Sequence, residues 1–331
     1  NKRSLAINFR DPRGLDLIRE MAGTADVLVE NFKPGVMSEM DMDWPVLAAK
    51  NPRLVFASIT GFGTTGPYGE WPGVDQIAQG MSGLMSVTGE PGRGPMRVGT
   101  ALADLSSGLF AAMGILVALH ERERSGRGQW VQTSLLQAQI FMLDFQAARY
   151  LIKGEVAGQE GNNHPTGAGT GMFKTVDGYI NIAASGDSLW EHFCKATGAA
   201  DLLTEPNFAN AALRTKNRTQ LNARLAEVML TKTNDEWVAL MDKAGVPCGP
   251  INTIDKVFAD PQVKHLGIVR PVDHPQYGPQ KVVGQPIHLS RYPQPEKLGH
   301  TPGAGEHTDA VLKSLGYDDA AIAGLRAKRA V

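Results

Sequence analysis

Apolar and polar positions along the first 150 residues alternate with the periods of strands and helices in turn. The segments 26–32 (DVLVENF) and 53–63 (RLVFASITGFG) are apolar and rich in β-branched residues, as expected for strands of a largely parallel sheet. Residues 11–25 carry an apolar stripe at helical spacing, and Asp11 stands where a helix N-cap is expected. This alternation predicts an α/β domain.

The same region continues with a long apolar helix. Residues 104–122 predict that helix, and residues 130–152 predict a strand followed by a second helix. Residues 3–9 (RSLAINF) also alternate between apolar and polar, which predicts a strand near the start. The apolar run 105–119 is too short to cross a bilayer, so we expect no membrane span.

The second half of the chain has a different pattern, which indicates a second domain. The glycine-rich segment 153–171 predicts a linker, and the dipeptide at 177–178 (Asp-Gly) predicts a β-hairpin. Residues 187–260 predict mainly helices, and the proline-rich segment 261–302 predicts loops. A final helix is expected within residues 305–331.

Composition limits the class of protein. The 331 residues are 42% hydrophobic and 20% charged, with a net charge of −1, which indicates a globular protein without a polyanion-binding surface. We therefore expect no nucleic-acid partner. Cys194 and Cys248 are far apart in the sequence, which fits a reducing compartment. With no signal-peptide pattern at the start, we expect a cytoplasmic protein.

Several chemistries lack their motifs. The sequence has no P-loop, no HExxH or Cys/His cluster, no GxSxG elbow and no GxGxxG after a strand. Its eight histidines are scattered. Phosphoryl transfer, serine hydrolysis and metal chemistry are therefore disfavoured, and we expect no metal site.

Asp104 is an isolated carboxylate at the start of the long apolar helix. As a helix N-cap it would contribute about 0.5–2 kcal/mol, and this is the ordinary interpretation. Its neighbours are small, however, and would let another molecule approach (Gly99, Ala101, Ala103, Ser106, Ser107 and Gly108). A poorly hydrated carboxylate in such a place is a better nucleophile. The spacing alone leaves both interpretations open.

Longer blocks of sequence are informative over nearly the whole chain. In order they are NKRSLAINF, ADVLVENFKPGVM, NPRLVFASITGFGTTGPY, DQIAQGMSGLMSVTG, RVGTALADLSSGLFAAMGILVALHERERSGRGQWVQTSLL, GVPCGPINTIDKVFADPQV and GEHTDAVLKSLG. These blocks, in this order, resemble the class III CoA-transferases, the family of formyl-CoA transferase and the carnitine CoA-transferase. The resemblance implies that Asp104 is a nucleophile. It would form a mixed anhydride with an acyl group and then an aspartyl-CoA thioester, with acyl-CoA as substrate and no bound cofactor.

The resemblance also assigns CoA contacts, position by position. The matching positions are Ile7, Asn8, Phe9 and Arg10 after the first block; Asn31, Phe32 and Lys33 in the ENFKPG turn; and Trp71, Pro72, Gly73 and Val74 along the pantetheine. An acid near the thioester in the family matches Asp75, which we expect to be catalytic. Each of these residues also has an ordinary interpretation as core or solvated surface.

Two departures from the family pattern stand out. Glu39 occupies a position where an arginine usually binds a CoA phosphate, so another base must compensate or the contact differs. Family chains also carry a first βα unit before the block that matches residues 1–9, and we expect this sequence to be a shortened form of such a chain.

Two rival functions remain. α-Methylacyl-CoA racemase, in the same superfamily, pairs the equivalent aspartate with a histidine, but Val74 occupies that histidine's position and leaves no second base. A non-catalytic CoA-binding subunit of a heteromeric transferase is the other rival, and the presence of Asp104 argues against it.

The resemblance implies a two-domain α/β fold, in which a large Rossmann-like α/β domain and a small α+β domain form a ring interlocked with a second copy as a homodimer. The expected domains are 1–150 with about 305–331 (large), 173–285 (small), and the linkers 151–172 and 286–304. Residues 165–173 are a candidate lid over the intermediate.

The acids exchanged are not specified by the sequence. We expect small dicarboxylic acids such as succinate, because the chain lacks the four-glycine insertion of the formyl and oxalyl enzymes. Three candidate partners for the substrate carboxylate are Arg97, His164 and Arg291.

Overall fold

The computed structural model describes all 331 residues, which divide into two compact units. Unit 1 contains residues 1–86, 96–157 and 269–331, and unit 2 contains residues 87–95 and 158–268. Each unit has its own sheet and its own core. The predicted linker bounds, 151–172 and 286–304, stay a prediction.

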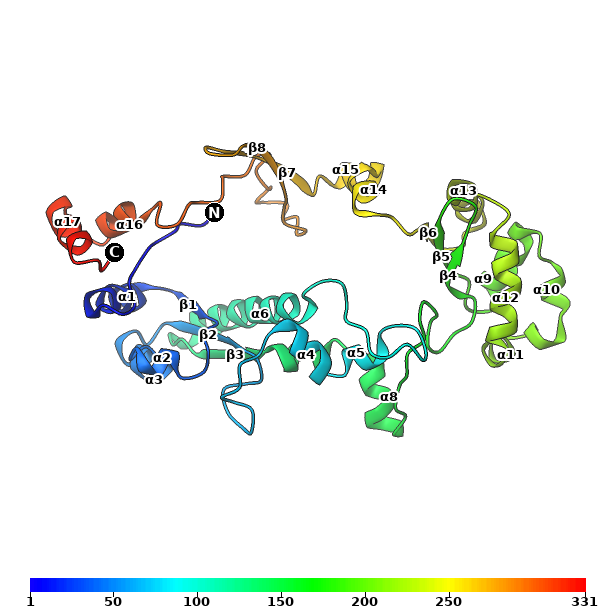
Figure 1. Cartoon of the computed structure of the whole chain (residues 1–331), viewed down its shortest axis with the longest axis horizontal. Coiled ribbons are helices and arrows are strands. Elements are labelled where there is room, and N and C mark those ends of the chain that lie inside the picture. The colour runs from blue at the N-terminus through cyan, green and yellow to red at the C-terminus, as the bar shows by residue number, and fades with distance from the viewer. The chain divides into compact units, whose positions relative to one another are not determined.

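Unit 1 is built on a parallel three-stranded sheet of order β1–β2–β3, formed by Val27–Glu30, Val55–Thr60 and Trp130–Ser134 (Figure 1). This confirms the α/β prediction and the strands predicted within 26–32 and 53–63. Parallel strands need crossover connections, and the crossover from β2 to β3 contains the long helix α6, Leu102–Ser125. The predicted helix at 104–122 is thus confirmed.

Helices cover both faces of this sheet. Phe56 packs among Met40, Leu47 and Trp44, next to α1, α2 and α3, whereas Ile59 on the opposite face packs against Ala103 and Leu135. The helices of this part of unit 1 besides α6 are α1 (Pro12–Thr24), α2 (Val36–Glu39), α3 (Trp44–Lys50), α4 (Asp75–Met81), α5 (Leu84–Val87), α7 (Leu135–Phe141) and α8 (Phe145–Lys153).

Helix α6 lies close against the sheet because of a glycine. A Cβ atom built on Gly114 would lie 2.7 Å from Cγ1 of Val131 on β3, so only glycine fits there without a shift. By length and composition α6 could cross a membrane, since an 18-residue window within it has a mean hydropathy of 1.9, although a core helix passes the same test. The helix is longer than the apolar run 105–119, and the expectation of no membrane span stays a prediction. In this structure α6 packs on β2 and β3.

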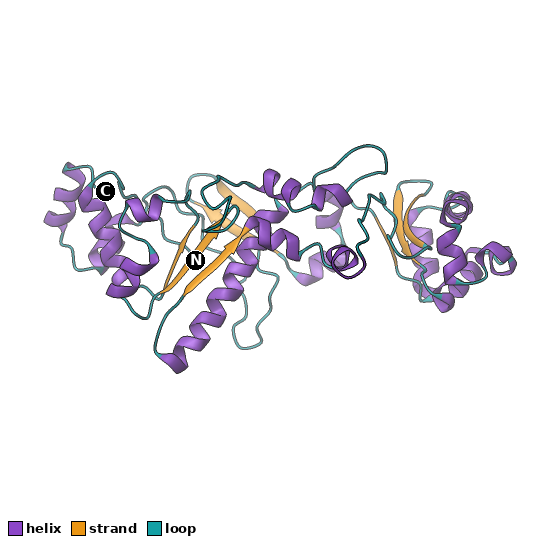
Figure 2. Ribbon diagram, turned by 90° about the horizontal axis from the view of Figure 1, so that it is seen from below, coloured by secondary structure: helices purple, strands orange, loops and turns teal.

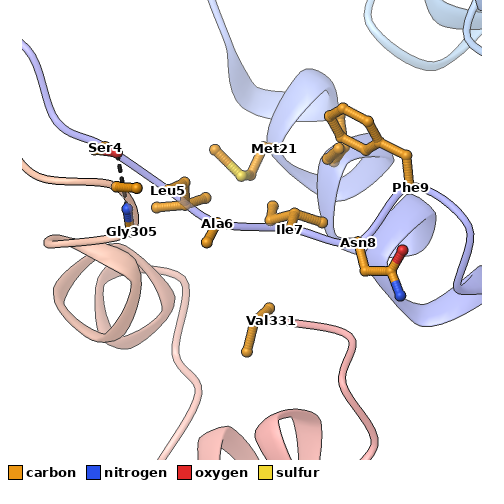
Figure 3. Close-up of a pocket in the computed structure, with 11 residues that line it drawn as sticks. Ser4, Leu5, Ala6, Ile7, Asn8, Phe9, Met21, Gly305 and Val331 are labelled. Atoms are coloured by element: carbon orange, nitrogen blue, oxygen red, sulfur yellow. Dashed lines mark hydrogen bonds between the residues drawn. The ribbon is translucent and has the colours of Figure 1, made fainter.

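The two ends of the chain meet in unit 1. Residues 4–8 are extended, but they bond to His307, Thr308 and Ala330 rather than to a strand. The strand predicted at 3–9 is therefore absent, because extended residues need a paired neighbour to form a ladder. The final helix is two helices, α16 (Thr308–Ser314) and α17 (Asp319–Ala327), separated at Gly316 with φ of 94°. A cavity of about 690 Å³ lies beside residues 4–9 (Figure 3).

Unit 2 is an antiparallel sheet, β4–β5–β6, with helices packed against it (Figure 2). Its strands are Thr170–Lys174, Tyr179–Ala183 and Cys248–Pro250, and the first two form the hairpin predicted at 177–178. Helices α9 to α15 and the 3₁₀ helix η1 are, in chain order, Asp187–Thr197, Asp201–Thr204, Pro206–Phe208 (η1), Ala211–Lys216, Arg218–Met229, Asn234–Ala244, Ile254–Ala259 and Pro261–Leu266. A separate hairpin in unit 1, β7–β8, is formed by Val269–His274 and Gly278–Val283.

Candidate active site

The candidate site lies where the parallel strands of unit 1 end, which is where α/β sheets bind ligands. After β2 the chain loops out and returns to α4. The return depends on two glycines, because a Cβ atom on Gly61 would lie 2.5 Å from Cα of Gly73, and one on Gly73 would lie 2.4 Å from Cα of Gly61. This close approach places Asp75, the first residue of α4, beside the sheet.

Asp75 supplies the helix cap that the sequence pattern suggested for Asp104. The N-cap of α6 is Ala101, which provides no side-chain hydrogen bond. Instead, Oδ1 of Asp75 accepts the backbone N–H of Ala103 at 2.9 Å. The carboxylate of Asp104, in the same first turn, is exposed and takes part in no hydrogen bond or ion pair. The interpretation of Asp104 as the cap is therefore wrong.

The electrostatics around Asp104 are unusual for an exposed carboxylate. Partial removal of its carboxyl group from water raises the pKa of Asp104, and the nearby Asp75 carboxylate raises it further. A raised pKa makes the ionised form a stronger base and nucleophile. Asp104 is thus a carboxylate without a hydrogen-bond partner, at the positive end of a helix.

The carboxylate of Asp75 has two further partners, Gln79 and Arg97. Only 8% of its surface is exposed, and its Oδ2 accepts a hydrogen bond from Nε2 of Gln79 at 2.8 Å. The guanidinium of Arg97 lies 3.5 Å from the same oxygen, and 45% of that side chain is exposed. Of the three predicted carboxylate partners, Arg97 is the one that lies beside Asp75. His164 belongs to unit 2, and Arg291 is an exposed residue after β8.

The segments predicted to contact CoA after the first block and in the ENFKPG turn meet in space. The rings of Phe9 and Phe32 contact edge to face, with centroids 6.1 Å apart. This contact joins Ile7, Asn8, Phe9 and Arg10 to Asn31, Phe32 and Lys33. Next to the turn lies a cavity of about 310 Å³, with aromatic walls that include Phe32, Trp44, Phe56 and Trp130. Lys33 also lines it, together with the acids Glu30 and Asp43, whereas Glu39 is exposed at the end of α2.

The third predicted CoA segment leads directly into Asp75. Trp71, Pro72, Gly73 and Val74 form the end of the loop before α4, and the Trp71 ring lies 4.3 Å from that of Tyr68. Val74 is 60% exposed and directly precedes the helix. An apolar side chain there cannot exchange a proton, which leaves the racemase interpretation without its second base at this position.

Gln79 is the site residue that sequence reasoning missed. It is fully buried and bonds both Asp75 and the chain that leads into α6. The available signal was its position four residues after Asp75, which puts both side chains on one face of a short helix.

Comparison with known proteins identifies the family of the chain. The profile of CoA-transferase family III matches residues 1–308. Human succinyl-CoA:glutarate CoA-transferase is 36% identical over 98% of this chain and 74% of its own. Succinate–glutarate CoA-transferase of Agrobacterium fabrum is 35% identical over 95% of this chain and 78% of its own. The crystal structure of a CAIB/BAIF family protein from Brucella suis superposes with a TM-score of 0.83, at 38% identity, covering 95% of this chain and 82% of that one.

The chain therefore belongs to the class III CoA-transferases. It is a CoA-transferase enzyme with the mixed α/β fold of that family, as the sequence resemblance predicted.

Proposed function

We propose that the protein moves CoA from an acyl-CoA to a small dicarboxylic acid, with Asp104 as covalent nucleophile. The observation that carries the proposal is that two neighbouring aspartates have different roles, one structural and one without a structural partner. Asp75 caps α6, so the carboxylate of Asp104 is left without a structural partner at the start of the same helix. Two acids with different environments and different roles are typical of active sites.

The reaction is a series of balanced acyl exchanges. The Asp104 carboxylate attacks the thioester carbonyl, which forms a mixed anhydride and releases CoA thiolate. The thiolate attacks the aspartyl carbonyl of the anhydride, which gives an aspartyl-CoA thioester and releases the donor acid. The acceptor carboxylate then displaces the thiolate to form a new anhydride. Finally the thiolate attacks the acceptor acyl carbon, which forms the new acyl-CoA and regenerates Asp104.

Three groups of residues support CoA binding in this proposal. The segments 7–10 and 31–33 meet through Phe9 and Phe32, and Lys33 supplies a positive charge beside an aromatic cavity. Lys33 would form the ion pair with a CoA phosphate that Glu39, a carboxylate, cannot form. The loop 71–74 would carry the pantetheine towards Asp75 and Asp104.

The choice of small dicarboxylic acids has two supports. The human and Agrobacterium relatives are named for succinate and glutarate, which carry two carboxylates each. The half-exposed guanidinium of Arg97 lies beside Asp75 and offers charge-assisted hydrogen bonds to a second carboxylate.

We also propose that the enzyme works as a homodimer. Helix α6 carries a row of exposed apolar side chains, and α7 and α8 also expose apolar side chains. These are Leu105, Leu109, Met113, Leu116, Val117, Phe141, Leu151 and Ile152. Contiguous exposed apolar surface of this kind marks an interface, and a second copy of the chain is the partner that the proposal assigns to it.

The test is covalent trapping on Asp104. The protein is mixed with succinyl-CoA, treated with hydroxylamine and mapped by peptide mass spectrometry, beside an Asp104→Ala variant. A hydroxamate on Asp104 in the parent protein, absent from the variant, supports the proposal. If no adduct forms with several acyl-CoA donors while the protein still binds CoA, Asp104 is not the nucleophile and the non-catalytic CoA-binding subunit becomes the better description.

A further inference from the structure

Gln79 joins α4 to the segment that leads into α6. Its side-chain Nε2 donates to Oδ2 of Asp75 at 2.8 Å and to the backbone carbonyl of Thr100 at 3.1 Å. Its Oε1 accepts the backbone N–H of Val98 at 2.9 Å. The residue has no exposed surface, and both of its N–H donors are used. The amide therefore has one orientation, fixed by three bonds.

Asp75 continues the same network to the reacting position. It uses Oδ2 for Gln79 and Oδ1 for the N–H of Ala103, the residue before Asp104. Two side chains one turn apart on α4 thus hold the start of α6 through the backbone of Val98, Thr100 and Ala103. Nothing else in the first turn of α6 provides a side-chain cap.

We propose that Gln79 is a positioning residue for Asp104, acting through Asp75 and through the backbone of residues 98–103. The inference rests on the proposed function, because it assumes that Asp104 reacts. A nucleophile must be held to a fraction of an ångström, and a displacement of about 1 Å is enough to lose about 10²-fold in rate. Gln79 does this without touching the substrate, since it is wholly buried.

The decisive variant is Gln79→Glu. When protonated, glutamic acid has the shape of glutamine, donates its one O–H to Asp75 and accepts the Val98 N–H, so it loses only the bond to Thr100. When ionised, it places a second carboxylate against Asp75, with Arg97 as the cation next to the pair and Asp104 as the further acid nearby. The rate of Asp104 hydroxamate formation, relative to the parent protein at the same pH, should therefore be close to one at pH 5 and fall about 10²-fold by pH 8.5.

Two control variants show whether the pH dependence comes from the charge at position 79. Gln79→Met fills the space without hydrogen bonds, so its rate should be reduced by a similar factor at every pH. Gln76→Glu makes the same chemical change on the exposed side of α4 and should follow the parent protein throughout. Circular dichroism is recorded at each pH.

The possible results distinguish a positioning role of Gln79 from a purely structural one. Recovery of Gln79→Glu in acid, with unchanged helical content across the range, supports positioning. A relative rate for Gln79→Glu that does not depend on pH overturns it, and so does loss of helical content in parallel with rate, which would make Gln79 only a stability residue. If the parent protein itself forms no adduct at Asp104, the proposed function fails first, whatever the variants do.

Discussion

The carboxylate of Asp75 accepts the backbone N–H of Ala103, so the residue next to Asp104 is held by a side chain from another helix. Capping from a distance in sequence has a chemical consequence. An aspartate that capped its own helix would be bound by backbone N–H groups and would lose nucleophilicity, since such bonds stabilise its ionised form. Here that role falls to Asp75, which also raises the pKa of Asp104 through its charge, as a second cause after desolvation.

The substitution Asp75→Asn should therefore change the pH dependence. The asparagine side chain keeps an oxygen for the Ala103 N–H but removes the negative charge, so the pKa of Asp104 should fall towards its ordinary value. Its amide nitrogen also faces the Nε2 donor of Gln79, so the rate itself should fall as well. The acid limb of the single-turnover rate, where Asp104 loses activity on protonation, should move to lower pH. Measuring Asp104 acylation between pH 4 and 8 tests this. An acid limb that stays in place would show that Asp75 does not influence the charge on Asp104.

Replacing Asp104 by asparagine should abolish transfer without destabilising the fold. Loss of a covalent nucleophile lowers turnover by about 10³-fold or more. Because the folded-state pKa of Asp104 is raised above 3.8, its ionisation disfavours the folded state at neutral pH. The melting temperature of Asp104→Asn should therefore be equal to or above that of the parent at pH 7, and the difference should shrink as the pH falls towards 4. A clear drop in melting temperature at pH 7 would contradict this.

Arg97→Met should separate dicarboxylic from monocarboxylic acceptors. Charge-assisted hydrogen bonds contribute about 1.5–3 kcal/mol, so KM for succinate or glutarate should rise by about 10- to 100-fold. KM for acetate or butyrate should stay within about twofold, since these acids have no second carboxylate. Arg93→Met, also exposed, is the matched control. Equal effects on both classes of acid would assign Arg97 to another role.

Gln139→Met should stabilise the protein. Gln139, on α7, is fully buried, and neither its side-chain oxygen nor its nitrogen has a hydrogen-bond partner in the protein. Removing such groups recovers a desolvation penalty of about 1–3 kcal/mol, measurable in urea unfolding. Gln137→Met on the same helix should bring no gain, because Gln137 is bonded to Ser134. A loss of stability in Gln139→Met would indicate that the amide holds a buried water.

Charge placed on the exposed row of α6 should prevent dimer formation. Leu109 and Leu116 are 68% and 67% exposed, so Leu109→Asp with Leu116→Asp should leave the fold of the subunit intact. Burying two carboxylates in an apolar interface is strongly unfavourable. Sedimentation analysis should show a dimer for the parent protein and a monomer for the double variant. A dimer that persists in the double variant would place the interface elsewhere.

Local features of the fold could be predicted from the sequence, whereas features that depend on distant partners could not. Asp11 caps α1, and the turn at 177–178 forms its hairpin, because both depend on a few neighbouring residues. The alternating residues 3–9 resemble a strand but bond to the end of the chain instead. A strand requires a paired neighbour, and periodicity does not show whether one is present.

The candidate site divides in the same way. Asp104 stood out because it is one acid among small apolar residues, and the family resemblance gave it a role. The cap at Ala103 comes from Asp75, and the buried bonds of Gln79 join α4 to residues 98–100. These contacts span about 20 to 30 residues of sequence and depend on how two helices pack, which no local pattern encodes.

The position of Asp104 also depends on a residue outside the candidate site, because Gly114 sets how closely α6 packs on β3. Gly114 lies ten residues along α6 from Asp104, or about 15 Å at 1.5 Å per residue, and a methyl group there would collide with Val131. Because α6 is one continuous helix, a displacement at Gly114 also moves its first turn, which contains Asp104. A substitution at Gly114 is therefore expected to shift Asp104, although Gly114 itself lies outside the candidate site.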